Sequence, residues 1–179
     1  MKPTDDKTIM IIGVGCVLLS DEGFGVHVAQ KIEQLYDFSA NVTVVDGGVL
    51  GVNLLGVISK PDHLIVVDVI RNGSAPGTLY RLTGKDLPER IRAKNSLHQV
   101  DFLEALTLCH ALDHVPETVI VGVEPEDMET LSTELTPTTA TRVDDVIDMV
   151  LAEIDRLGAT YTKGTSEYVP GYPFHDRCH

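Results

Sequence analysis

Acidic side chains and one histidine stand where apolar runs of the sequence give way to polar segments. Asp21 and Glu22 follow the first apolar run, and Asp46 and Asp68 end two later ones. His98 precedes a helical pattern. One histidine with two carboxylates suits a divalent metal of borderline hardness, and it leaves coordination positions open for water or substrate. We therefore take Glu22, Asp68 and His98 as candidate metal ligands.

This three-ligand site is expected to have modest affinity, so that metal is engaged only in a working complex. The same residues also fit ordinary structural roles. Asp21 or Glu22 would favour the N-terminus of the following helix, and Asp68 would be a carboxylate that simply ends a strand. Segment 46–48, which contains two glycines, would be a turn because glycine allows positive φ. The residue pattern alone leaves these alternatives open.

The glycines after the first apolar run do not form a phosphate-binding motif. The Gly-Val-Gly run at 13–15 lacks the third glycine of a dinucleotide fingerprint, because Leu18 stands in its place. No Gly-Lys followed by Ser or Thr occurs in the chain. The two acids that follow would also repel a phosphate. We therefore expect no organic cofactor at this loop.

The elements that must position these residues follow from the apolar periodicity. Runs rich in β-branched residues predict strands, and apolar residues at three- and four-residue steps predict helices. The predicted strands are 9–14, 42–45, 64–69, 78–82 and 118–123, and the predicted helices are 24–35, 50–58, 100–108 and 143–157. This alternation predicts an α/β fold: a twisted, mostly parallel five-stranded sheet sandwiched between helices. In such sheets ligands bind beyond the carboxyl ends of the strands, where the candidate acids lie.

The chain has 179 residues, which suits a single domain. We assign residues 1–158 to that domain. After Gly158 the periodicity stops, so residues 159–179 are predicted to be a flexible C-terminal tail. Because the chain shows no spare apolar stripe, we expect a monomer.

Charge and cysteine content restrict the partners and the compartment. Fourteen Lys and Arg against 27 Asp and Glu give a net charge of −13, which would repel nucleic acids and anionic membrane surfaces. The three cysteines are far apart and form no metal-binding pair, which favours a reducing compartment. The first apolar run is too short for a signal peptide or a membrane span. We expect a cytoplasmic protein.

Five short motifs follow one another from the first predicted strand towards the last predicted helix. They are Gly13-Val-Gly-Cys-Val-Leu-Leu-Ser-Asp21-Glu22-Gly23-Phe-Gly25, Asp46-Gly47-Gly48, the strand-ending Asp68, Ser96-Leu-His98-Gln and Gly122-Val-Glu124-Pro125. Each motif is weak alone. In this order and spacing, the set resembles the hydrogenase maturation protease family.

The resemblance implies an endopeptidase that removes the C-terminal extension of a [NiFe]-hydrogenase large-subunit precursor after nickel insertion. It implies that Glu22, Asp68 and His98 contact nickel supplied by the precursor. It also implies that segment 46–48 (Asp-Gly-Gly) serves substrate recognition. If the metal only docks the substrate, Asp46 is the candidate general base.

Two positions depart from the family pattern: Cys16 replaces an asparagine, and Val49 replaces a threonine. Neither change removes a candidate ligand, but both bear on the choice of substrate. A non-cleaving nickel-checkpoint or chaperone protein is the alternative function. A metal-dependent hydrolase acting on another substrate is a third possibility, because fold does not fix function.

Overall fold

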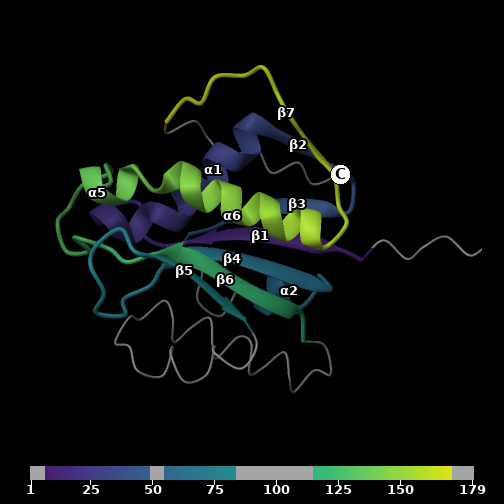
Figure 1. The fold of residues 1–179 in the computed structure, drawn as a ribbon, viewed down its shortest axis with the longest axis horizontal. Helices are drawn as coiled ribbons and strands as arrows, with labels where there is room; N and C mark the ends of the chain where they lie inside the picture. The colour runs from purple at the N-terminus through teal and green to yellow at the C-terminus, as the bar shows by residue number, and fades with distance from the viewer. Residues whose placement is uncertain (1–6, 49–54, 84–114, 171–179) are drawn as a thin grey trace, which may run out of the picture.

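The computed structural model describes residues 7–48, 55–83 and 115–170, and its central feature is a five-stranded sheet (Figure 1). The strand order is β3-β1-β4-β6-β5. The strands are β1 (Ile9–Val14), β3 (Val42–Gly48), β4 (His63–Val69), β5 (Leu79–Thr83) and β6 (Glu117–Val123). The first four in this order are parallel to their neighbours, and β5 runs antiparallel at the edge. The predicted mostly parallel α/β sheet is confirmed.

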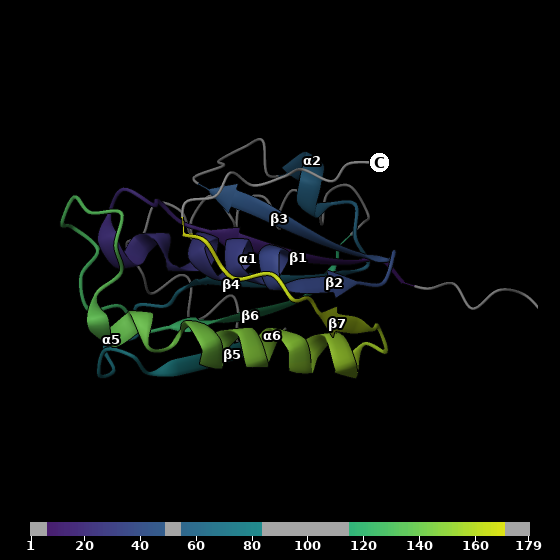
Figure 2. The same ribbon diagram turned by 90° about the horizontal axis from the view of Figure 1, so that it is seen from above.

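Helices cover both faces of this sheet (Figures 1 and 2). Helices α1 (Phe24–Leu35) and α6 (Val143–Arg156) pack on one face, and the short α2 (Leu55–Ile58) lies on the other. Two further short helices, η1 (Ser20–Gly23) and α5 (Pro137–Ala140), lie in loops. The predicted helix 100–108 lies outside the described residues, as does the first part of predicted helix 50–58.

The two faces of the sheet follow from alternation along each strand. In β1, Ile9 and Ile11 enter the core beneath α1 and α6, whereas Met10 and Ile12 face the side of α2. Because a side chain on either face is covered by helices, the strand carries apolar residues at every position. This double burial is why β1 was recognisable as a continuous apolar run.

Glycines allow α1 to lie directly on the sheet. A Cβ atom on Gly25 would be 2.1 Å from the carbonyl oxygen of Val67 and 2.4 Å from that of Val14. A Cβ on Gly13 would in turn be 2.1 Å from the carbonyl oxygen of Gly25. No larger side chain fits at these distances. The start of α1, and with it η1, is therefore held close to the ends of β1 and β4.

A second, two-stranded sheet joins β2 (Tyr36–Phe38) to β7 (Tyr161–Lys163) in antiparallel pairing. Rings of Tyr36, Phe38 and Tyr161 lie with centroids 5.9 to 6.4 Å apart. We predicted a loose tail after Gly158, and for Tyr161–Lys163 this was wrong. Strands of three residues are too short to show an alternation, so the sequence pattern could not predict them.

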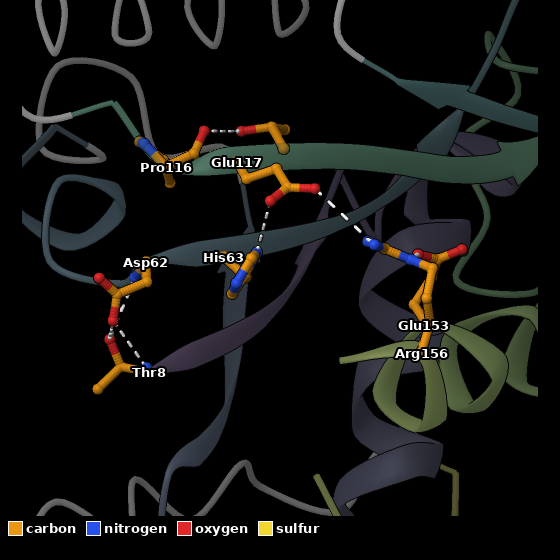
Figure 3. A network of polar contacts seen from close by, with 8 residues as sticks. Thr8, Asp62, His63, Pro116, Glu117, Glu153 and Arg156 are labelled. Carbon is orange, nitrogen blue, oxygen red and sulfur yellow. Dashed lines mark hydrogen bonds and ion pairs between the residues drawn. The ribbon is translucent and has the colours of Figure 1, made fainter. Parts of the chain in front are cut away.

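Charged side chains at the amino ends of β4 and β6 fasten α6 to the sheet (Figure 3). His63 Nδ1 lies 3.3 Å from Glu117 Oε2, and Arg156 pairs with both Glu117 and the buried Glu153. Arg81 of β5 also binds Glu153, at 2.5 Å. Burial by itself raises the pKa of Glu153, but the two arginines outweigh it and hold that pKa below its usual value. These charged residues therefore have a structural role: they hold α6 against the sheet.

None of the helices in the described segments is long and apolar enough to cross a membrane.

Candidate functional site

The carboxyl ends of β1, β3, β4 and β6 lie along one edge of the sheet, which we call the carboxyl rim. In Figure 2 the loop after β1, which contains η1, lies beside the loop that follows β6 at this end of the molecule. Hydrogen bonds join the two loops: Ser20 N–H donates to Ser132 O, and Asp21 N–H donates to Asp127 O. Segments more than a hundred residues apart thus meet next to the candidate acids.

Glu22 lies in η1 and is only 8% exposed. The backbone at Gly15 packs closely against the backbone of Glu22. Gly15 has φ of +137°, and a Cβ atom there would be 1.8 Å from the carbonyl oxygen of Glu22. Glycine is required at position 15 for both reasons. The loop therefore fixes the backbone that carries Glu22.

Asp68, the penultimate residue of β4, is 9% exposed. Its Oδ1 accepts a hydrogen bond of 2.7 Å from the N–H of Val69. The pKa of Asp68 is raised to about 8, chiefly by burial and in addition by the nearby charge of Glu22, against the lowering effect of that hydrogen bond. Asp68 is thus mostly protonated at neutral pH when no cation is near. A cation bound between Glu22 and Asp68 would favour the ionised form of Asp68, which would then give up its proton.

The structure therefore brings two of the three predicted metal ligands into mutual electrostatic contact. The third, His98, lies outside the described residues. Within the described segments no group of three His, Cys, Asp or Glu side chains is arranged to hold a metal. The joint role of Glu22, Asp68 and His98 stays a prediction.

Asp46 and its two glycines end β3 at the same rim, where Asp46 pairs with Gly13 of β1. Asp46 Oδ1 accepts from Gly48 N–H at 3.0 Å, and Oδ2 accepts from Gln30 Nε2 of α1 at 3.5 Å. Gly48 has the positive φ (+47°) that glycine allows, but residues 46–48 belong to β3 and do not form a separate turn. These contacts fix the orientation of the Asp46 carboxylate. Its roles in recognition, shared with Gly47 and Gly48, and as a general base stay predictions.

His27 of α1 lies close enough to Asp46 to be affected by the charge of that carboxylate. Burial lowers the pKa of His27, while the carbonyl of Thr133 and the charge of Asp46 act to raise it. The ring is therefore mostly neutral at pH 7. His27 and Gln30 are one helical turn apart, so both lie on the side of α1 from which Gln30 reaches Asp46.

Asp21 is completely buried and holds the loop after β6 in place. Its Oδ2 accepts from the backbone N–H groups of Glu126 and Asp127 at 2.9 and 3.0 Å. Its Oδ1 accepts from Thr136 N–H and from the Thr139 hydroxyl. Burial by itself raises the pKa of Asp21, but these hydrogen bonds prevail and the pKa is lowered. Asp21 is a structural clamp beside Glu22 rather than a helix-terminus residue alone.

We expect Asp21→Asn to destabilise the protein by about 3 kcal/mol at neutral pH, because an amide would present N–H groups to backbone donors. Urea unfolding measures the change. The exposed Asp144, which pairs with Lys31 at 2.6 Å, gives the control Asp144→Asn, for which a loss below about 1 kcal/mol is expected. The lowered pKa of Asp21 contributes stability above about pH 4, so the difference between wild type and Asp21→Asn should shrink as the pH falls below that value. Equal losses of unfolding free energy for Asp21→Asn and Asp144→Asn would contradict the structural role of Asp21.

Glu124, which follows β6, has a similar structural role. Its carboxylate accepts from the N–H groups of Asn72 and Gly73 and from the Tyr80 hydroxyl at 2.5 Å. Burial acts to raise the pKa of Glu124, but its hydrogen bonds prevail and the pKa is lowered. Glu124 therefore ties the loop after β4 to β6 and β5.

Removing the hydroxyl in Tyr80→Phe is expected to destabilise the protein by about 2 kcal/mol, since it deletes a buried hydrogen bond to a charged group. Thermal unfolding provides the measurement. Tyr161→Phe is the matched control, because the Tyr161 hydroxyl makes only a long, exposed contact of 3.4 Å with Asp155. If Tyr80→Phe and Tyr161→Phe lost the same stability, the hydrogen bond from Tyr80 to Glu124 would contribute no more than an exposed contact.

Comparison with known proteins identifies relatives across most of the chain. The family model described as hydrogenase maturation protease matches residues 26–153. The hydrogenase expression/formation protein HupD of Thiocapsa roseopersicina is 34% identical over 155 residues, which cover 86% of this chain and 70% of the relative. The hydrogenase 2 maturation protease of Escherichia coli K12 is 33% identical over 170 residues, covering 94% of this chain and 99% of the relative.

Among solved structures, the hydrogenase maturating endopeptidase HybD from Escherichia coli is similar over nearly its whole length. The TM-score is 0.83 at 34% sequence identity, with 87% of this chain and 97% of that chain covered. The chain therefore has the fold of this endopeptidase.

Proposed function

The chain belongs to the hydrogenase maturation protease family, and from this premise we propose that it is an endopeptidase that removes the C-terminal extension of a [NiFe]-hydrogenase large-subunit precursor after nickel insertion. The observation that supports this best is the pair of buried acids at the carboxyl rim. Burial and the charge of Glu22 disfavour ionisation of Asp68, so that Asp68 holds a proton up to about pH 8. Such a pair is suited to receive a cation that arrives from outside.

In this proposal the nickel is part of the substrate. The precursor presents its metal to the rim, where Glu22, Asp68 and His98 contact it, and Asp68 releases its proton. A precursor without nickel leaves Asp68 protonated and makes no metal contact with these residues, so it docks poorly. The metal therefore acts as a checkpoint that ties cleavage to completed nickel insertion.

Cleavage itself is a hydrolysis. A water molecule attacks the carbonyl carbon of the scissile peptide bond, the C–N bond breaks, and the amine leaves with a proton. The substrate's nickel can polarise the carbonyl or the water. If it does neither, Asp46 is our candidate to accept the proton of the attacking water, since Gly48 and Gln30 hold its carboxylate in one orientation.

Turnover separates this proposal from a nickel-checkpoint or chaperone protein that binds the precursor without cutting it. One part of the protein is mixed with about fifty parts of nickel-loaded precursor, and the precursor mass is followed with time. A protease converts nearly all of it. A chaperone instead leaves a one-to-one complex and an unchanged precursor mass, which would refute the proposal.

We propose a monomer that acts in the cytoplasm, uses no organic cofactor and binds neither nucleic acid nor membranes. The net charge of −13 supports the last two points, because phosphate-rich surfaces would repel the chain. Two departures from the family pattern bear on the choice of precursor: Cys16, in the loop after β1, and Val49, which lies outside the described residues.

A further inference from the structure

Two exposed leucines stand beside the buried acids at the carboxyl rim. Leu18, in the loop after β1, is 58% exposed, and Leu131, in the loop after β6, is 82% exposed. The described segments contain only two other large apolar side chains with comparable exposure, Val115 and Val169. Single exposed apolar residues are common, but neighbouring ones on a functional edge indicate an interaction surface. We call Leu18 and Leu131 the leucine pair.

Backbone pairing makes the two leucines neighbours. Leu19 and Ser132 form a parallel β-bridge, and the N–H of Ser132 donates to the carbonyl of Leu18 at 3.1 Å. Leu18 and Leu131 directly precede the two bridge partners, so they lie in backbone segments that adjoin one another.

The loop that carries Leu131 is held in shape before any partner arrives. Asp127 Oδ1 accepts from the N–H groups of Glu129 and Thr130 at 2.9 and 3.1 Å. Ser132 Oγ accepts from Glu134 N–H at 3.0 Å, and the Asp21 clamp secures both ends of the segment. A leucine presented on a fixed loop loses little entropy when it is covered, which favours binding.

The surroundings of the leucine pair are acidic. Glu126, Glu129 and Glu134 are exposed in the same loop, and the sequence contains no Lys or Arg between residues 115 and 141. The loop after β1 contains none either. An apolar contact framed by negative charge fits a partner segment in which an apolar side chain lies next to Lys or Arg.

The position of the pair links it to the acids. Leu18 is four residues before Glu22, whose N–H donates to the carbonyl of Leu19 at 3.1 Å. We propose that Leu18 and Leu131 form a docking contact for an apolar side chain of the precursor, in a segment close to the scissile bond that also carries Lys or Arg. This inference rests on the proposed function, and it names the chemistry that the enzyme reads next to the nickel.

The test uses the double variant Leu18→Ser/Leu131→Ser with nickel-loaded large-subunit precursor. We expect KM for processing and Kd for the precursor to rise by about tenfold or more, since an apolar contact is lost. The kcat should stay within about twofold, because the acids are untouched. Val115→Ser, which changes a 41% exposed valine just before the start of β6, is the matched control and should change neither constant.

A second variant tests whether the acidic side chains around the leucine pair contribute to binding of the precursor. Glu126→Gln/Glu129→Gln should raise KM and weaken its dependence on salt, because both side chains are exposed and act through the field around the leucine pair. An unchanged KM and Kd in the leucine variant, or a fall in kcat alone, would overturn the docking contact while leaving the protease intact. If wild type fails to process the precursor, the proposed function fails, and Kd still decides whether the leucine pair binds it.

Discussion

Replacing Asp68 by asparagine is expected to abolish processing of the precursor and, at the same time, to make the metal-free protein more stable near pH 8. Processing should fall at least about a hundredfold, because a candidate contact to the nickel is lost. Stability should rise because the buried carboxylate, whose pKa is raised to about 8, is replaced by a neutral group of similar size. A purely structural residue would not show these opposite effects.

The sign of the pH dependence follows from proton binding. Between about pH 4 and about pH 8, folded Asp68 keeps a proton that the unfolded chain has lost, so the wild type loses stability as the pH rises through this window. Because asparagine does not titrate, Asp68→Asn does not lose stability in this window. Melting scans in a chelator should therefore show little difference near pH 4.5 and an advantage of about 4 °C or more for Asp68→Asn near pH 8, the shift that ~2 kcal/mol produces in a chain of this size. A variant less stable than wild type at pH 8 would refute the raised pKa.

His98→Ala is also expected to abolish processing, but it should leave stability unchanged. The sequence places His98 at a loop-to-helix junction outside the apolar core pattern, so its side chain is not expected to support the fold. Loss of the only histidine in the predicted ligand set removes the nitrogen donor for nickel. The measurement is precursor mass together with a melting scan.

His110→Ala is the matched control for this prediction, because His110 follows the predicted helix 100–108 and has no predicted role. Normal turnover of His98→Ala would remove His98 from the ligand set. An equal loss in both histidine variants would instead point to a general effect on the surrounding segment.

The sheet was predictable because its strands are covered on both faces. The run from Ile9 to Val14 carries an apolar residue or glycine at each position, which only a doubly buried strand requires. The same holds for the apolar part of β4. By contrast, β2 and β7 meet through three residues each, and their aromatic contacts between Tyr36 and Tyr161 span residues far apart in the sequence.

The candidate site was predictable only in part, because sequence shows which residues lie at the rim but not what they contact. Glu22 and Asp68 were placed there by the rule for parallel sheets, and the structure brings them together. The clamp at Asp21 was not predicted, since its partners lie 105 to 118 residues away. Glu124 stood at the rim like the other acids, yet its hydrogen bonds hold the loop at Asn72 and Gly73.

We propose that the enzyme cuts its precursor only after the nickel has been inserted and offered to the acids at the rim. The direct measurement compares matched nickel-loaded and nickel-free precursors, each incubated with the protein and weighed by mass spectrometry. We predict that the nickel-loaded precursor loses its C-terminal peptide and that the nickel-free precursor keeps its full mass. Equal cleavage of both precursors would contradict the nickel checkpoint, and an intact nickel-loaded precursor would contradict the protease itself.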